Sequence, residues 1–296
     1  MTVSVSSVLR LLFICAAASL SLPVRAANDP LKDAIALLES RRVPEARAIL
    51  AALAERDPGN GQALWYLGKS DLLMQHREDA VVSLRRAVDL APSDHRILAD
   101  YGTACLLRAS DLGYSLKSIR YARQGRDALL KAVELAPDVI AYREGLAAFY
   151  RRAPGLVGGG IDKAYAQAAE IAKRDPARGV IIKASIQAEE KKYDEARAAC
   201  EEALRTQPDS YLALYTLGRI ASDSGRELAR GEQALRRCLE LTPAIQEPDF
   251  AGVHYRLGLI AQKSGKLDTA RTEYETALKL EPTFDLAADA LSKLDK

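Results

Sequence analysis

The sequence has few of the residues on which metal and redox chemistry depend. Its 296 residues include three histidines and four cysteines, and neither an HExxH nor a CxxC motif is present. We therefore expect no metal site and no thioredoxin-like redox pair. No Ser-His-Asp, Cys-His or paired-carboxylate arrangement is legible either. We expect a protein that is not an enzyme and that uses no cofactor.

An excess of one charge is also lacking. The chain has 42 Lys and Arg against 40 Asp and Glu, a formal net charge of +2. This balance argues against a nucleic-acid partner, because nucleic-acid affinity depends on clustered positive charge. Apolar residues make up 48% of the chain, enough to bury a core. At roughly 150 residues per domain, length alone would predict two domains.

Long apolar runs are confined to the start of the chain. Arg10 precedes the apolar stretch Leu11–Leu22, which Pro23 ends. We predict a secretory signal peptide over residues 1–26, cleaved after Ala26, since a dozen apolar residues cannot cross a ~30 Å hydrocarbon layer. No later run is long enough to span a bilayer. The expected location is the periplasm of a Gram-negative bacterium, or outside the cell.

Cleavage would change the charge and cysteine counts. Loss of Arg10 and Arg25, with no acidic residue, leaves 40 basic and 40 acidic side chains. Three cysteines remain, Cys105, Cys200 and Cys238. An odd number means that at least one is unpaired or pairs with another molecule. A disulfide between Cys200 and Cys238 stays open at this point.

Prolines divide the rest of the chain at nearly regular intervals. Seven of the 12 prolines end segments with a helical pattern such as AVDLAP or AVELAP, at separations of 34, 45, 39, 32, 35 and 39 residues. They are Pro58, Pro92, Pro137, Pro176, Pro208, Pro243 and Pro282. Because proline stops a helix, each one marks the end of a repeated helical unit.

Small residues recur at fixed places within these units. Leu-Gly pairs stand at Leu67-Gly68, Leu217-Gly218 and Leu257-Gly258, and Tyr101-Gly102 matches them. Alanine recurs twelve positions before the proline, at Ala46, Ala80, Ala164, Ala196 and Ala270. Glycine and alanine remove side-chain bulk where the two helices of a hairpin approach closely.

The pattern resembles the tetratricopeptide repeat family, whose consensus runs W-x2-L-G-x2-Y, A-x3-F and P. Residues 61–94 and 251–284 match it best. The resemblance implies an all-α, right-handed superhelical solenoid of about seven helical hairpins, with a C-terminal capping helix over 285–296. The predicted repeats are 27–60, 61–94, 95–139, 140–176, 177–210, 211–245 and 251–284.

Three units are longer than this pattern, with extra residues near Ala109–Tyr114, Pro154–Gly160 and Ala244–Pro248. The first predicts a lengthened helix pair. The glycine-rich second insert lacks a following Gly-Lys-Ser/Thr and a preceding strand, which excludes a P-loop. We interpret it as an irregular turn within the fourth repeat. A small-ligand or enzyme site built on this insert is the alternative.

The resemblance also implies a concave groove lined by the first helix of each hairpin. Trp, Tyr and Arg most often carry interface energy, and they recur at groove positions. The predicted partner-binding residues are Trp65, Tyr66, Lys69, Arg96, Arg151, Arg152, Arg178, Tyr215, Arg219, Tyr255 and Arg256. Leu259 and Lys263 share this face with the acidic Asp100, Glu144, Glu189 and Asp223. Simple packing of the aromatic side chains between helices is the competing interpretation.

These features together predict a function in binding. We expect an exported, non-enzymatic scaffold or adaptor that holds a protein or peptide segment, in cell-envelope assembly or secretion. The clamp that some members use for a chaperone's C-terminal carboxylate is not supported, because Trp65 and Tyr66 occupy the corresponding positions. The basic groove only weakly favours an acidic peptide. Self-association through exposed repeat ends stays open.

Overall fold

The computed structural model describes residues 29–243 and 247–294. Within these ranges the chain forms fifteen α-helices, one short 3-10 helix and no strand, which confirms the predicted all-α solenoid. No helix in these ranges has both the length and the hydropathy needed to cross a membrane. The predicted signal peptide, residues 1–26, lies outside the described residues.

The first fourteen helices pair in chain order as hairpins, and the fifteenth follows the last pair. Their bounds are α1 (Pro30–Glu39), α2 (Val43–Arg56), α3 (Gly61–Leu73), α4 (Arg77–Leu90), α5 (His95–Asp111), α6 (Leu116–Leu135), α7 (Ile140–Arg152), α8 (Ile161–Ala172), α9 (Pro176–Glu189), α10 (Tyr193–Thr206), α11 (Tyr211–Ser224), α12 (Leu228–Glu240), α13 (Phe250–Lys263), α14 (Leu267–Leu280) and α15 (Asp285–Leu294). The 3-10 helix η1 is Gly155–Val157. The extra residues of the third unit lengthen α5 and α6 to 17 and 20 residues, as predicted.

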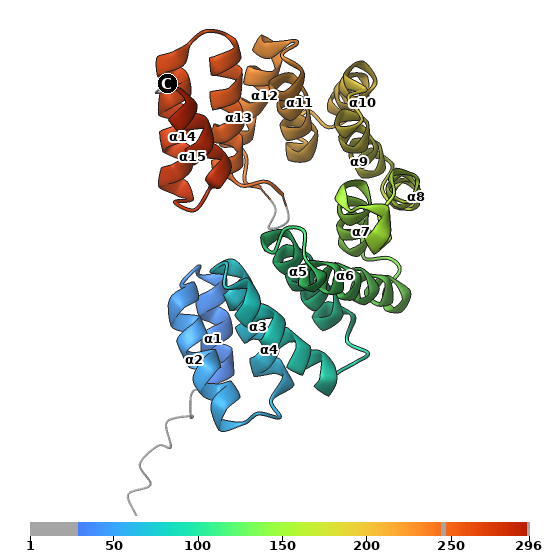
Figure 1. Cartoon of the computed structure of the whole chain (residues 1–296), viewed down its shortest axis with the longest axis vertical. Coiled ribbons are helices and arrows are strands. Elements are labelled where there is room, and N and C mark those ends of the chain that lie inside the picture. Colours follow the sequence, from blue (N-terminus) through green and yellow to red (C-terminus); the bar gives the residue numbers. More distant parts are fainter. Residues whose placement is uncertain (1–28, 244–246, 295–296) are drawn as a thin grey trace, which may run out of the picture.

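The stack curves because its two sides pack differently. Successive odd-numbered helices contact one another from α1 to α13. Close contact on this side makes it the inner one, and Figure 1 shows α9 and α11 inside the curve with α8, α10 and α12 outside. The first helices of the hairpins therefore line the concave face.

Small residues set the spacing inside each hairpin. A Cβ added at Gly218 would lie 2.2 Å from Cγ of Leu235, and one at Gly258 would lie 2.4 Å from the Tyr274 ring. Only glycine lets the paired helices approach this closely. The alanine column Ala46, Ala80, Ala164, Ala196 and Ala270 is fully buried. The glycine and alanine positions that recur in the sequence are therefore the positions where paired helices contact each other.

Local capping fixes where several helices begin and end. Asn60 accepts a hydrogen bond from the backbone N–H of Ala63, and Asp94 accepts one from Arg96, each at 2.9 Å. These caps satisfy N–H groups that a helix N-terminus leaves without a partner. The turn between α13 and α14 uses Gly265 at φ 76°, which completes the reversal of the chain.

The three cysteines of the described residues are separate, buried thiols. Cys105 lies on α5, while Cys200 and Cys238 lie on the second helices of neighbouring hairpins. The Cys200–Cys238 disulfide that the sequence left open is not formed. Both thiols fill space in the core between α9 and α13, as small apolar side chains do.

The two arms of the curve touch. Gln75, in the turn between α3 and α4, donates its side-chain N–H to Glu281 at 2.8 Å, and Thr283 donates to Gln75 at 3.4 Å. These partners come from the second and the last hairpins. The contact joins the two arms across the mouth of the curve, where α1–α4 face α13–α15 (Figure 1).

Candidate partner-binding groove

All eleven predicted partner-binding residues lie on odd-numbered helices, α3, α5, α7, α9, α11 and α13. The structure brings most of them into two groups. We call the first the aromatic cluster; it consists of Trp65, Tyr66, Lys69, Arg96 and Asp100. We call the second the arginine cluster; it consists of Arg151, Arg152, Glu189, Arg219, Asp223 and Arg256.

The aromatic cluster is organised around Trp65. Its indole N–H donates to Asp100 on the next inner helix at 2.6 Å. Nζ of Lys69 lies 5.1 Å from the centre of the ring, and Cζ of Arg96 lies 4.8 Å from it, both in cation–π range. Trp65 is only 7% exposed. It therefore packs mainly between helices, and a partner would meet Tyr66, Lys69 and Arg96 instead.

The carboxyl group of Asp100 is held away from solvent in this cluster. Burial raises its pKa above the usual value, and the hydrogen bond from Trp65 opposes that rise. Lys69 also favours the ionised form. Burial outweighs both, so this carboxyl group gains a proton more readily than an exposed aspartate.

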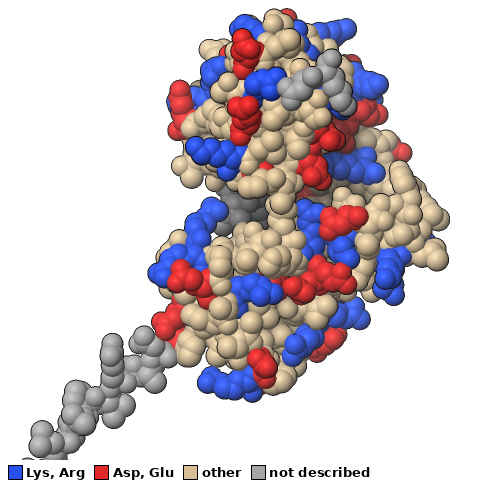
Figure 2. Space-filling model, turned by 60° about the vertical axis from the view of Figure 1, so that its left-hand side comes forward, with Lys and Arg blue, Asp and Glu red and all other residues tan. Residues whose placement is uncertain are grey.

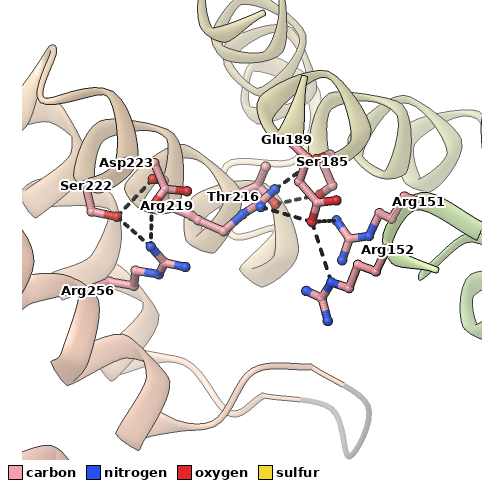
Figure 3. A network of polar contacts seen from close by, with 9 residues as sticks. All are labelled: Arg151, Arg152, Ser185, Glu189, Thr216, Arg219, Ser222, Asp223 and Arg256. Carbon is pink, nitrogen blue, oxygen red and sulfur yellow. Dashed lines mark hydrogen bonds and ion pairs between the residues drawn. The ribbon is translucent and has the colours of Figure 1, made fainter. Parts of the chain in front are cut away.

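The arginine cluster is centred on Glu189 near the end of α9 (Figure 3). Oε1 of Glu189 lies 2.8 Å from Nη1 of Arg151 and 3.7 Å from Nε of Arg152, both on α7. The same oxygen lies 3.7 Å from Nη1 of Arg219 on α11. Arg219 also donates to the backbone carbonyl of Ser185 at 3.1 Å. One carboxylate thus serves three guanidinium groups from two neighbouring helices.

The other half of the cluster links α11 to α13. Arg256 pairs with Asp223 and donates to Oγ of Ser222 at 3.2 Å, as Figure 3 shows. Lys263 donates to the backbone carbonyl of Asp223 at 3.0 Å. Nε of Arg256 is buried and has no hydrogen-bond acceptor within the part of the chain that the structure describes. Asp223 therefore does not satisfy every N–H donor of Arg256.

Burial changes the acidity of these arginines. It lowers the pKa of Arg151 to about 10, and the neighbouring Arg152 adds to the effect. It also lowers the pKa of Arg219. Burial acts in the same direction on Arg256, but Asp223 and Tyr215 outweigh it and raise that pKa. The Glu189 carboxylate alone therefore does not offset the burial of its two most enclosed arginines.

The other two predicted tyrosines, Tyr215 and Tyr255, flank the arginine cluster and are half-buried. The Tyr255 ring lies 5.3 Å from Phe284 and 6.1 Å from Tyr274, between centroids. Cζ of Arg256 lies 5.5 Å from the centre of the Tyr255 ring. Tyr215 packs against the core formed between α9 and α13. Both rings stabilise neighbouring helices, and each keeps part of its surface exposed.

Arg178, at the start of α9, has two acidic partners. It forms a bidentate pair with Glu144 and lies 3.7 Å from Glu247. Glu247 belongs to the connection between α12 and α13, the insert whose residues 244–246 lie outside the described ranges. The repeat pattern carries no signal for this contact, because Glu247 lies outside the repeats, in the connection that follows the neighbouring hairpin α11–α12.

One group of potential metal ligands was missed in the sequence. His76 lies between two aspartates, and ligand atoms of Asp71, His76 and Asp79 lie within 4.8 Å of one another. The repeat pattern does not bring these three residues together, but the α3–α4 turn folds Asp71 back onto the start of α4. The guanidinium group of Arg47 lies 2.5 Å from Asp71 and 3.5 Å from Asp79. Arg47 supplies one positive charge to these two carboxylates, while Oδ2 of Asp71 is buried and has no hydrogen-bond partner among the described residues.

The glycine-rich insert of the fourth unit is a tight turn that contains η1. The N–H groups of Gly158 and Gly159 donate within the insert, and that of Gly160 donates to Tyr150. The carbonyl groups of the insert instead accept hydrogen bonds from cationic side chains. Arg126, for example, donates to the carbonyl of Val157 at 2.9 Å. A Cβ at Gly159 would lie 1.8 Å from the Ala153 carbonyl oxygen. These N–H groups therefore hold the turn together and are not available to cradle a phosphate.

Comparison with known proteins agrees with the repeat geometry. Two family models described as tetratricopeptide repeat match the sequence, one at residues 251–284 and one at residues 31–70 and 183–244. The chain is a tetratricopeptide repeat protein. No curated protein matched its sequence.

Three solved structures have a similar fold. One is a tetratricopeptide repeat protein from Parabacteroides merdae, with a TM-score of 0.66 and 12% identity over 90% of this chain and 98% of that one. Another is the human IFIT1 dimer with m7Gppp-AAAA, with a TM-score of 0.59 and 19% identity over 90% of this chain and 62% of that one. A third is the Cut9-Hcn1 hetero-tetramer of APC/C, with a TM-score of 0.58 and 14% identity over 90% of this chain and 49% of that one. At these identities the likeness extends to the fold alone.

Proposed function

We propose that this tetratricopeptide repeat protein is a non-enzymatic scaffold that binds a peptide segment of a partner protein in its concave groove. The observation that carries the proposal is the arginine cluster, which places four guanidinium groups from three inner helices on one concave wall. A groove of this kind fits an extended or helical peptide. The aromatic cluster adds Tyr66, Lys69 and Arg96 on the opposite arm.

The chemistry of the groove supports binding more than catalysis. Its carboxylates are paired, Glu144 and Glu189 with arginines and Asp100 with the Trp65 indole. Function would then depend on how tightly a partner is held. Arginine and tyrosine suit that role because they combine contact area with polar groups.

The proposal includes a location. Residues 1–26 have the pattern of a signal peptide, so the scaffold would act in the periplasm or outside the cell. Cell-envelope assembly or secretion is the process in which an exported adaptor of this kind would serve.

A peptide library tests the proposal directly. We expect the purified protein to select a discrete set of peptides, with binding measured by calorimetry and by fluorescence of Trp65, the single tryptophan. Tyr215→Ala should weaken a selected peptide about tenfold, the effect of a typical interface tyrosine. Adding Tyr255→Ala should weaken it further, at some loss of stability because Tyr255 packs on Phe284.

Tyr114→Ala is the matched control, because Tyr114 is fully exposed in the α5–α6 turn and outside the predicted site. Peptides that bind equally well to wild type, Tyr215→Ala and Tyr114→Ala would contradict binding in the groove. Light scattering on the same samples tests self-association, since stacking through the repeat ends would raise the mass without any peptide.

A further inference from the structure

We propose that the partner segment is acidic and that its carboxylates bind at the arginine cluster. This inference rests on the proposed function and adds the chemistry of the partner. The cluster itself holds four arginines and two carboxylates, Glu189 and Asp223. The excess positive charge lies on the concave wall, where a partner would contact it.

The shortage of carboxylates is greatest around Glu189. Three guanidinium groups approach its one oxygen at 2.8, 3.7 and 3.7 Å, and each guanidinium carries several N–H donors. Two carboxylate oxygens cannot accept from all of them. A second carboxylate from a partner would supply the missing acceptors, and bidentate pairing with arginine suits that group best.

The exposure of these arginines shows where a ligand would approach. The side chains of Arg151 and Arg219 are 14% and 12% exposed, whereas that of Arg152 is 69% exposed. The enclosed pair holds Glu189 in the wall, and Arg152 projects from it. Figure 2 shows a hollow between the two arms, with both basic and acidic side chains at its rim. A carboxylate that enters the hollow would meet Arg152 first.

The chain already places one acidic side chain against a concave arginine. Glu247 lies 3.7 Å from Arg178, although its connection follows α12 and Arg178 begins α9. The side chain of Glu247 is 10% exposed, so this carboxylate is largely enclosed. Glu247 shows that the inner wall accommodates a carboxylate from outside the hairpin that bears the arginine.

The same wall suits carboxylates better than a nucleic acid. Glu189 and Asp223 lie among the arginines and would repel a phosphate chain, which binds through dense positive charge. Single-stranded nucleic acids also need exposed aromatic faces for stacking. Trp65 is 7% exposed, and Tyr255 packs on Phe284. A peptide can instead offer isolated carboxylates spaced to reach Arg152.

The test uses two fluorescein-labelled peptides that differ only in charge, one with four glutamates among serine and glycine and one with four glutamines. We expect the glutamate peptide to bind at least about tenfold more tightly at low salt, and the difference to shrink near 0.15 M salt because of screening. Arg152→Gln should weaken it about fivefold. Arg86→Gln, the same charge change at an exposed site on the second helix α4, should leave affinity unchanged.

Glu189→Gln should change the affinity for the glutamate peptide in the opposite direction. It removes the internal carboxylate that competes for the arginines, so the glutamate peptide should bind more tightly. If this variant does not fold, the comparison of Arg152→Gln with Arg86→Gln decides the question, because both positions are exposed.

Equal affinity for the two peptides would overturn the inference, as would equal losses in Arg152→Gln and Arg86→Gln. Tighter binding of a single-stranded RNA than of the glutamate peptide would also overturn it. If library peptides without acidic residues bind and depend on Tyr215, the proposed function stands and the acidic partner is wrong.

Discussion

Trp65 and Asp100 are joined by a hydrogen bond of 2.6 Å between the inner helices of two successive hairpins. The indole donates and the carboxylate accepts, although burial disfavours the charged form of Asp100. The bond places the single tryptophan next to a titratable group whose pKa is raised. Trp65 is thereby a natural reporter of the protonation state of Asp100.

We predict that Trp65 fluorescence changes with pH with a midpoint above 3.8, the ordinary pKa of aspartate. A raised pKa means that the folded state holds its proton more tightly than the unfolded state. Asp100 therefore adds stability at low pH, and this contribution is lost as pH rises through the raised value. Fluorescence titration of wild type and Asp100→Asn checks this. The transition should disappear in the variant, and its persistence would assign it to another group.

Close helix packing predicts a size limit at Gly218. Gly218→Ala would place a Cβ 2.2 Å from Cγ of the fully buried Leu235. We expect it to lower the free energy of unfolding by about 1–2 kcal/mol. This is a net value, because alanine is favoured over glycine in a helix by roughly 1 kcal/mol and that gain offsets part of the loss. Urea denaturation followed by circular dichroism measures the change.

Gly61→Ala is the control, because its Cβ would lie 3.6 Å from Leu90, an ordinary contact. We expect it to be neutral or slightly stabilising. Equal stability of the two variants would mean that α11 and α12 lie farther apart than described.

The buried thiols should react slowly while the protein is folded. Burial raises the pKa of Cys105 to about 11 and those of Cys200 and Cys238 to about 12. Since the thiolate is the reactive form, little labelling by an aromatic disulfide is expected at pH 8. In denaturant all three thiols should react, in addition to Cys15 if residues 1–26 are retained. Finding only one of the three would reveal a disulfide.

The contact across the mouth should influence shape more than stability. Each of its two exposed hydrogen bonds contributes about 0.5–1.5 kcal/mol at most. Gln75→Asn shortens the side chain but tolerates the positive φ of 60° found there. We expect nearly unchanged melting and a larger radius of gyration by small-angle X-ray scattering. Gln62→Ala, exposed on the same hairpin, should change neither. An unchanged radius in Gln75→Asn would show that other contacts keep the arms together.

The sequence predicted the features that are set within one hairpin. The glycine at 258 and the tyrosine at 274 lie 16 positions apart, and Gly68 packs on Leu84 and Gly218 on Leu235 in the same way, so their contact follows from the repeat. The shared helical face of Arg151 and Arg219 also followed from the repeat. Their convergence on Glu189 did not, because it depends on side-chain conformations between helices.

Contacts between distant hairpins could not be predicted in this way. The partner of Gln75 depends on the small rotation from each hairpin to the next, summed over several units, and that of Glu247 depends on a connection that the repeat pattern does not describe. The inserts change that sum. Sequence spacing therefore predicts which residues lie on the concave face, but it does not predict which parts of that face lie opposite each other.

The contact between Gln75 and Glu281 has a consequence for how quickly different partners associate. A peptide with a free end can thread along the axis while the arms remain joined. A segment flanked by folded domains has no end to thread, so it must wait for the arms to separate. Its association rate would then be limited by opening, and terminal segments would bind faster than internal ones of equal affinity.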